Sequence, residues 1–512
     1  MFLFRGCITI LLSFGLIANA QETNLQEQLS LNGSLVQALK LNPDMATERI
    51  NVEVSKDQLT REKGEFSWGL ETISRYEDRD KPQNTREFIA VGGISFPGNS
   101  ARIFSDQNFT TKEGLKKRFK TGTTFELSST FSRLENTLNQ TSESSLYSPE
   151  YESFTGITMT QPLLKGFGKS ANMVRINIAK NRIEATKYLA EIRAINLIAE
   201  TASRYTDVIS IEEILSIRKN NILLAESLLS KTQELFKAER GVKIDVTTAE
   251  LALFQRQDDY IGSNSLKVER LNNLFELIDM PPATNSQIKF KPLGAFFDGD
   301  NLPNKDDLIN IALKNRVDLK YYDELIESSN LNLVKAKDET KALLNFSGSY
   351  GAYGLSDKGV DSYSESFNRQ GMEWSVGLNF KMILDKKARN AGYRVAINEM
   401  AKAKIEKDKV KKAIVLEIDT AYERLVSYKK ALRTARKAVE LAEERLNQEQ
   451  ELWQKGVGDV YRLVEQQQML GNTKIRTVEA EGALSKSVIS LWISSGQVFQ
   501  KLGIDRNLIG NE

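Results

Sequence analysis

Two long stretches of the chain carry the apolar spacing of coiled-coil helices. Residues 169–240 contain no Gly or Pro over 72 positions, and residues 393–455 contain none either. In the second stretch, apolar residues follow an unbroken 4-3 spacing at Ile414, Ile418, Ala421, Leu425, Tyr428, Leu432, Ala435, Val439, Ala442 and Leu446. The first stretch has a similar stripe at Val208, Ile211, Leu215, Ile222, Ala225, Leu229 and Phe236. A seven-residue apolar repeat predicts long helices that pack as left-handed coiled coils.

Shorter segments alternate instead with a period of two, which is typical of strands. Residues 372–384 place Trp374, Val376, Leu378, Phe380, Met382 and Leu384 on one face, and Ser375, Gly377, Asn379 and Lys381 on the other. Residues 66–76, 124–131, 154–160 and 344–354 are further strand candidates. Such a sheet either covers the core of a soluble domain or faces lipid on one side and a watery lumen on the other.

Breaks in these patterns mark elbows and turns. The strand regions pass into the long helices at 161–168 and 381–392. Pro162, Gly166 and Gly168 are expected to make the first elbow, and Gly392 the second. The long helices end at the short segments 240–245 and 455–459. The pattern therefore predicts two strand-to-helix elbows and two helical hairpins.

The chain repeats itself. Four pairs of short segments recur in the same order: 38–44 with 312–318, 160–166 with 380–386, 244–246 with 458–460, and 274–275 with 491–492. The offset falls from 274 to 220 between the first two pairs, so the first half carries 54 extra residues, around 80–150. We therefore expect two structural repeats, residues 21–292 and residues 293–512.

Composition removes several classes of function. The 512 residues have a formal net charge of +2, no His and a single cysteine, Cys7. Without imidazole or further thiols, zinc sites, disulfides and Cys or His nucleophiles lose their usual groups. We expect no enzyme activity, no metal, no cofactor and no nucleic-acid partner.

The N-terminus predicts export. Residues 1–20 have one Arg, an apolar run from Cys7 to Ile17, and Ala18-Asn19-Ala20 as a small-residue cleavage site. This pattern is typical of a secretory signal peptide. The alternative, a membrane anchor, needs about 20 apolar residues, which this run does not reach.

Two predicted strands per half make about four, and four strands cannot close a barrel. An open sheet in a membrane would leave backbone groups without partners. We therefore expect a mainly α protein with a transmembrane β part: an oligomeric β-barrel whose strands pass into long α-helical coiled-coil rods in the periplasm. Two chains would give a barrel filled by its own side chains, and three or more would leave a bore.

The chain resembles the TolC-like outer-membrane efflux proteins over residues 30–503. The resemblance rests on "TQPLLKGFGK" (160–169) with Asn177, Ala179 and Asn181, on "LNPD" (41–44), on the repeat, and on the two turns that enter "DV". It implies a homotrimer in the outer membrane, with a shared 12-stranded barrel that continues into a long α-helical coiled-coil tunnel across the periplasm. It also implies that a periplasmic adaptor joins this duct to an inner-membrane transporter. Its expected function is that of a passive exit duct for efflux or secretion. Residues 112–131 also have the pattern of an additional hairpin, which leaves the number of strands per chain open.

Three charged residues just after the two hairpin turns, Asp245, Asp459 and Arg462, are candidates for a periplasmic gate. Asp245 and Asp459 each follow a turn, where Asp favours the N-cap position of the next helix. In a trimer they would also form rings of carboxylates. The resemblance implies that Asp459 narrows the closed tunnel, while Arg462 stands where the family can have a second Asp.

The turns themselves match the tip that the family uses to meet its adaptor. The candidates are Gly241, Val242, Lys243, Gly456, Val457 and Gly458. The alternative is that a tight turn between helices simply requires glycine.

Four aromatic residues of the predicted strands are candidates for interfacial aromatic girdles or for ordinary strand packing: Trp68, Tyr76, Tyr350 and Trp374. A second hypothesis for the whole protein is a periplasmic coiled-coil scaffold or adaptor without a barrel.

Overall fold

The computed structural model describes residues 28–82, 103–137, 139, 146–282, 289–290, 303–368 and 371–510. The expected signal peptide, residues 1–20, lies outside these ranges. No helix within them combines the length and the apolar character that a membrane crossing needs.

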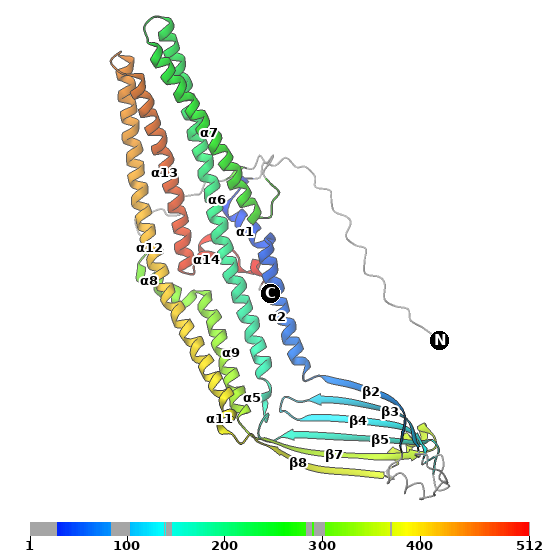
Figure 1. Ribbon diagram of the computed structural model, residues 1–512. Coiled ribbons are helices and arrows are strands. Elements are labelled where there is room, and N and C mark those ends of the chain that lie inside the picture. The colour runs from blue at the N-terminus through cyan, green and yellow to red at the C-terminus, as the bar shows by residue number, and fades with distance from the viewer. Residues whose placement is uncertain are drawn as a thin grey trace. The chain divides into compact units, whose positions relative to one another are not determined.

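The order of elements repeats along the chain (Figure 1). Each half has a short strand, a short helix, a medium helix, barrel-type strands, a four-residue helix and two long helices. The helices of the first half are α1 (Leu31–Leu41), α2 (Pro43–Gly64), α5 (Lys169–Asn172), α6 (Val174–Lys237) and α7 (Lys243–Leu277). Those of the second half are α8 (Lys305–Asn315), α9 (Val317–Glu339), α11 (Lys386–Arg389), α12 (Ala391–Gln454) and α13 (Val460–Ser494). Helix α14 (Val498–Leu502) and a 3-10 helix (Arg506–Ile509) follow α13.

Matching lengths define how the halves align. Helices α6 and α12 both have 64 residues, and α7 and α13 both have 35. A constant offset of 217 residues therefore relates the two hairpins. This offset corrects the pairing of segment 244–246 with 458–460, because it places Asp245 at the position of Arg462 and Asp459 at the position of Val242.

The chain forms two compact units. The helical unit comprises the described residues of 1–42, 197–301 and 424–490, and the sheet unit those of 43–196, 302–423 and 491–512. In the helical unit the strands β1 (Gln28–Leu29) and β6 (Lys289–Phe290) pair in parallel. The Tyr205 hydroxyl donates to the Leu29 carbonyl oxygen at 2.9 Å, which ties α6 to β1.

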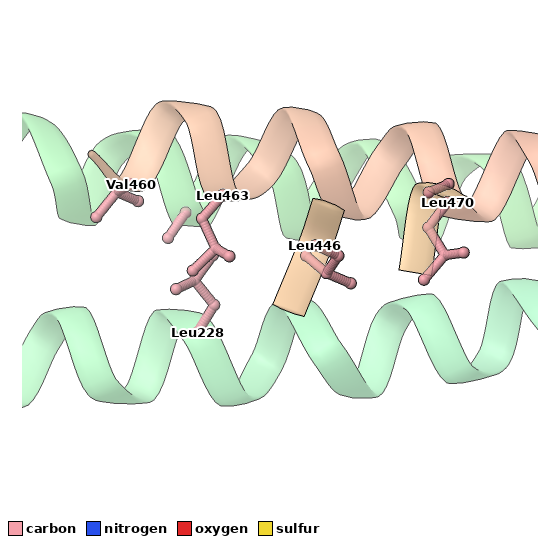
Figure 2. Packing of buried hydrophobic residues seen from close by; sticks show 7 residues of the cluster. Leu228, Leu446, Val460, Leu463 and Leu470 are labelled. Atoms are coloured by element: carbon pink, nitrogen blue, oxygen red, sulfur yellow. The ribbon is translucent and has the colours of Figure 1, made fainter. Parts of the chain in front are cut away.

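Apolar side chains from all four long helices form the core of the helical unit near the turns (Figure 2). The cluster consists of Leu228, Ala249, Ala442, Leu446, Val460, Leu463 and Leu470. Most residues of the predicted stripes are buried, including Val208, Ala225, Ile418 and Leu425. Phe236 and Tyr428 are instead exposed. The predicted coiled-coil packing is thus confirmed, with the stripes leaving the core at these two aromatic residues.

The sheet unit contains one antiparallel sheet whose described part has six strands, in the order β2-β3-β4-β5-β7-β8. The strands are β2 (Trp68–Pro82), β3 (Ile103–Arg118), β4 (Thr124–Asn136), β5 (Glu150–Pro162), β7 (Leu343–Ser356) and β8 (Gly371–Lys381). The expectation of about four strands is therefore wrong. The extra pair, β3 and β4, comes from the 54-residue excess and includes the additional hairpin that the pattern of residues 112–131 allowed. Polar residues such as Lys112, Glu113 and Lys116 blur the alternation of β3.

The register gives the sheet two chemically distinct faces. Residues directly opposite each other in a ladder point to the same side. The apolar face carries Trp68, Leu70, Tyr76, Leu115, Phe125, Leu127, Ile157, Met159, Phe346, Tyr350, Trp374, Val376, Leu378 and Phe380. The polar face carries Glu71, Arg75, Lys112, Lys116, Glu126, Thr158, Ser349, Ser375, Gly377 and Asn379. All four candidate girdle residues lie on the apolar face, where Trp68, Tyr76, Tyr350 and Trp374 are exposed.

Helix α10 (Gly359–Phe367) covers the apolar face at the end far from the elbows. The Ser153 hydroxyl donates to the Ser362 carbonyl oxygen at 2.6 Å, and the rings of Phe131 and Tyr363 stack with centroids 5.6 Å apart. The rest of the apolar face stays exposed along β7 and β8.

The first elbow follows the prediction. Strand β5 ends at Pro162, and Gly166 and Gly168 adopt φ angles of 80° and 87°, which favour glycine. The Gly166 amide donates to Asp338 at 2.7 Å, and the Asn172 side chain donates to the carbonyl oxygens of Gly166 and Gly168.

The second elbow differs from the prediction. Gly392 is the second residue of helix α12, with open space around the position of a Cβ, so it makes no bend. The chain turns instead at residues 382–385, and Asp385 caps α11 by accepting from the Lys387 amide at 2.8 Å. Strand β8 ends at Lys381, so Met382 and Leu384 belong to this elbow and not to the strand.

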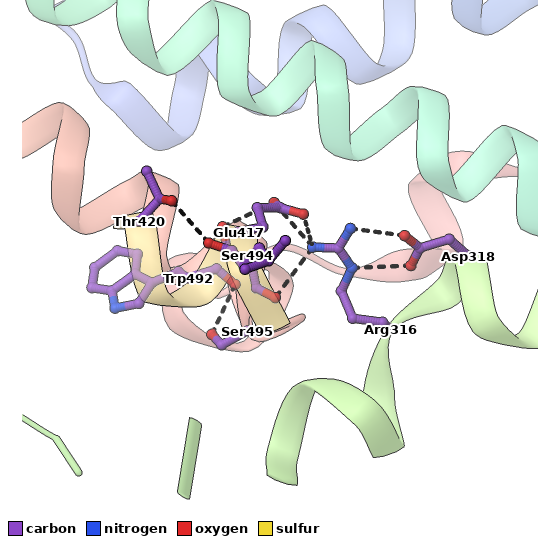
Figure 3. Close-up of polar contacts among 8 residues, drawn as sticks. Arg316, Asp318, Glu417, Thr420, Trp492, Ser494 and Ser495 are labelled. Carbon is purple, nitrogen blue, oxygen red and sulfur yellow. Dashed lines mark hydrogen bonds and ion pairs between the residues drawn. The ribbon is translucent and has the colours of Figure 1, made fainter. Parts of the chain in front are cut away.

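A half-buried arginine, Arg316, holds the junction between α8 and α9 (Figure 3). The Arg316 guanidinium donates to both oxygens of Asp318, at 3.0 and 2.7 Å, and to Glu417 at 3.0 Å. Burial alone would lower the pKa of Arg316, but the two carboxylates outweigh it and raise this pKa above its ordinary value. Arg316 is therefore a charged structural joint within the sheet unit.

Candidate functional site

The turn between α6 and α7 is closed by a left-handed residue and a glycine. Glu239 has a φ of 54°, and the Arg240 amide donates to the Leu235 carbonyl oxygen at 2.9 Å. A Cβ on Gly241 would lie 3.2 Å from the Phe236 amide nitrogen. Lys243 places its ammonium 6.0 Å from the centroid of the Phe236 ring.

The turn between α12 and α13 has a stricter glycine requirement. Gly456 has a φ of 76°, and the amides of Val457 and Gly458 both donate to the Leu452 carbonyl oxygen. A Cβ on Gly458 would lie 2.6 Å from the Trp453 amide nitrogen, closer than real side chains approach. Turn geometry therefore accounts for glycine at 456 and 458.

Apolar side chains project into solvent at and just beyond both turns. Val242, Ile244, Val457 and Tyr461 are 58%, 71%, 79% and 64% exposed. We call these four residues the tip surface. Val242 and Val457 were predicted, whereas Ile244 and Tyr461 were missed. The sequence could have revealed them, because both are apolar residues that lie off the stripe that packs the long helices.

The two acidic gate candidates, Asp459 and Asp245, have different local structural roles. Asp459 is an N-cap, because its carboxylate accepts from the Tyr461 amide at 3.0 Å at the start of α13. Asp245 is not a cap. It is the third residue of α7, whose N-cap position is Val242 without a side-chain hydrogen bond. The prediction of an N-cap role for Asp245 is therefore wrong, because α7 begins at Lys243, two residues before Asp245.

The structure brings Asp245 and Asp459 close enough to influence each other. Burial raises the pKa of the Asp245 carboxyl, and the charge of Asp459 raises it further, against a hydrogen bond with the Val242 backbone. Two carboxylates that share a site disfavour full ionisation. Arg462 lies one helical turn into α13, at the position equivalent to Asp245.

A buried arginine that sequence reasoning missed links three helices of this unit. Arg256 on α7 is 3% exposed, and its Nη1 donates at 3.0 Å to both the Asn221 carbonyl oxygen on α6 and Gln467 Oε1 on α13. Burial lowers its pKa, and the charge of Asp259 acts in the opposite direction. No motif marks Arg256, since a single cation in a helical stripe looks like surface.

Comparison with known proteins agrees with this architecture. Residues 308–497 match the family model of the outer membrane efflux proteins. No curated protein matches the chain by sequence.

Several solved outer-membrane channels share the fold. The outer-membrane channel OprN is 14% identical, with a TM-score of 0.66 over 92% of this chain and 90% of its own. VceC of Vibrio cholerae is 10% identical, with a TM-score of 0.65 over 91% and 96%. CmeC of Campylobacter jejuni is 13% identical, with a TM-score of 0.62 over 91% and 86%.

At these identities the structural matches establish the fold, and the family match supplies the class of protein. This class consists of channels and not of enzymes. Together with the two-faced sheet and the paired helical hairpins, these findings show that residues 308–497 match the outer membrane efflux protein family and that the whole chain has the fold of the solved outer-membrane channels.

Proposed function

We propose that the protein works as a homotrimer that passively conducts substrates delivered by an inner-membrane transporter, and that a periplasmic adaptor docks on the tip surface. The observation that carries this proposal is the exposure of Val242, Ile244, Val457 and Tyr461 at the two turns. Exposed apolar groups that cluster at one end of a molecule mark interaction sites. The hypothesis of a scaffold without a barrel leaves the exposed apolar face of the sheet unexplained.

A charged residue placed in the apolar tip surface tests the docking. Val457→Asp should abolish dye efflux in cells that depend on this duct, while the purified variant still forms channels in planar bilayers. Ile50→Asp is a matched control, because Ile50 is 62% exposed on α2 and away from the turns in sequence. Normal efflux with Val457→Asp and Ile244→Asp combined would refute docking at the tip surface.

We also propose that Asp245 and Asp459 from three copies form the cation-attracting mouth of the tunnel. Like charges gathered by symmetry favour cations, as acidic rings do in other pores. Asp459→Asn removes the charge but keeps an oxygen that can cap α13, so it separates the gate from the cap.

Planar-bilayer recordings test this mouth. Asp459→Asn and Asp245→Asn should each lower the preference for cations over anions, and the double variant should lower it most. Arg462→Gln should raise the preference, since it removes a cation one turn from Asp459. If none of these variants changes selectivity, the constriction lies elsewhere.

A further inference from the structure

The number of strands per chain changes the barrel that three copies would form. The described part of the sheet has six strands, and β3 and β4 pair along their length with β2 and β5. The ladders run without interruption from Trp68 opposite Lys117, through Lys117 opposite Phe125, to Phe125 opposite Met159. The extra hairpin is therefore part of the sheet and not an appendage of a loop.

The turn of this hairpin is built into the first elbow. The Gly168 amide donates to the Thr121 carbonyl oxygen at 3.0 Å, and Arg118 donates to Glu65 at 2.5 Å and to Asn172 at 2.8 Å. A Cβ on Gly122 would lie 2.3 Å from the Gly166 carbonyl oxygen. The hairpin thus starts at the same level as the strands that enter the long helices.

The hairpin also continues both faces of the sheet. Leu115 and Leu127 lie in one row between Leu70 and Ile157 on the apolar face. Lys116 and Glu126 lie on the polar face. The apolar face of the hairpin carries Glu113 and Lys117 too, and the Lys117 ammonium lies 5.0 Å from the Trp68 ring centroid near the elbow.

Within the described chain, the outer edges of β2 and β8 have no neighbouring strand. A membrane does not tolerate such edges, since their backbone groups would lack partners. Strand β2 starts just after α2 and runs away from the level of the elbows, whereas β8 runs back toward it. Strand β8 of one copy can therefore pair with β2 of the next in the antiparallel sense.

We propose that three copies of this chain close an 18-stranded barrel in which Val376 of one copy lies opposite Tyr76 of the next. The count is three times the six strands of the described sheet. This inference rests on the homotrimer proposed above, and it departs from the twelve strands that the family resemblance implies.

The register follows from geometry. Through the ladders, Trp68 lies level with Val376 of the same chain. Because equivalent faces must match, the next copy can only be shifted by an even number of residues. With strands about 4.8 Å apart and a rise of about 3.3 Å per residue, shifts of four, six, eight and ten give strand tilts of about 25°, 35°, 43° and 49°. Only shifts of six and eight fall in the usual range of about 35–45°.

Charge selects between these two shifts. A shift of eight places Lys381 opposite Glu71 and Glu373 opposite Arg79, whereas a shift of six places Glu373 opposite Glu77. Opposite charges across a strand pair stabilise it, and like charges do the reverse. Arg79 also pairs with Asp106 of its own chain, and Glu373 accepts from the Tyr353 hydroxyl. The shift of eight puts Val376 opposite Tyr76.

The consequence is a wide exit. At a tilt of about 43°, eighteen strands give a backbone diameter of about 37 Å, and twelve strands would give about 25 Å. Barrels of this strand number leave an aqueous channel. The extra hairpin therefore widens the outer-membrane end of the duct.

Disulfide cross-linking tests the register and the number of chains. The only natural cysteine is Cys7, in the expected signal peptide, so background cross-links are few. Ser375→Cys with Glu77→Cys should form intermolecular disulfides in isolated outer membranes, in a ladder that ends at trimers. Ser375→Cys with Ile73→Cys, displaced by four residues, should cross-link about tenfold more slowly or less. A ladder that ends at dimers, or faster reaction of the displaced pair, would overturn the proposal.

A matched pair of variants tests whether the hairpin lies in the membrane. Leu127→Arg, on the apolar face, should lower the yield of folded protein in the outer membrane by about tenfold or more. Ser128→Arg, on the polar face, should leave this yield within about twofold. Equal yields would exclude the hairpin from the barrel wall. The two experiments measure strand pairing between copies and insertion into the membrane, and neither measures conduction. Their failure is therefore distinct from failure of the proposed export function.

Discussion

Asn42 and Arg316 occupy equivalent positions in the two halves and hold equivalent carbonyl oxygens. The Asn42 amide donates to Leu277 at the end of α7, at 3.1 Å, and Arg316 Nη1 donates to Ser494 at the end of α13, at 3.2 Å. Leu277 and Ser494 are themselves related by the offset of 217 residues. The repeat thus conserves a bond to the last turn of each returning helix, while the donor changes from an amide to a guanidinium.

We expect Arg316→Ala to lower the free energy of unfolding more than Asn42→Ala. Loss of Arg316 removes the hydrogen bonds that it donates to the Asp318 and Glu417 carboxylates, at a cost of about 1.5–3 kcal/mol. Loss of Asn42 removes one hydrogen bond, at a cost of about 1 kcal/mol. Thermal unfolding of the detergent-solubilised variants, followed by circular dichroism, measures both. Lys437→Ala, which breaks an exposed pair with Glu440, is the control and should change little.

Asp459→Ala should destabilise the start of α13 by about 0.5–2 kcal/mol, because it removes the N-cap acceptor. Asp459→Asn should retain most of this stability. Asp245→Ala should cost less than Asp459→Ala, since Asp245 does not occupy the N-cap position of its helix. Thermal unfolding of the three variants side by side decides the point. A larger loss for Asp245→Ala would contradict the assigned caps.

The pH dependence of stability should report the raised pKa of Asp245. Because burial and Asp459 raise this pKa in the folded protein, the folded state holds the proton more tightly than the unfolded chain. The resulting stability is present below about pH 4 and is lost as the pH rises through the folded pKa. Asp245→Asn lacks this loss. The melting temperature of the variant relative to the natural protein should therefore rise between pH 4 and pH 7, whereas a constant difference would argue against the coupling.

Arginine on the two faces of β8 should behave differently in the membrane. Val376 lies on the apolar face and is 57% exposed, so Val376→Arg places a charge against acyl chains, at a cost of about 2–4 kcal/mol near mid-bilayer. Asn379 lies on the polar face, and Asn379→Arg should insert nearly normally. The amount of heat-resistant protein in outer-membrane fractions measures insertion. Equal insertion of both variants would mean that β8 does not face lipid.

Gly392→Ala should stabilise helix α12 slightly, by about 1 kcal/mol, because alanine favours helices and no atom crowds the new Cβ. Gly168→Ala should instead be destabilising, since its φ of 87° strains any residue with a Cβ. Melting temperatures of the two variants should shift in opposite directions. A loss of stability in Gly392→Ala would restore the idea that this glycine forms the second elbow.

The sequence by itself determined the features that depend on local spacing. A 4-3 stripe defines which side of a long helix is apolar, and a period of two defines the faces of a strand, so the coiled coils and the two faces of β8 follow from residue order alone. Glycines at positions 166, 168 and 456 were recognisable for the same reason, because their role is a backbone angle that glycine adopts without strain.

Only the tertiary structure decided what depends on pairing over long distances. Strand β3 has weak alternation, and it joins the sheet because β2 and β4 supply ladder hydrogen bonds on both sides. The sharing of one neighbourhood by Asp245 and Asp459, the burial of Arg256 among three helices, and the contact of Gly122 with the first elbow likewise arise from segments far apart in the chain. Such contacts have no local pattern, since their free energy comes from surfaces that meet only after folding.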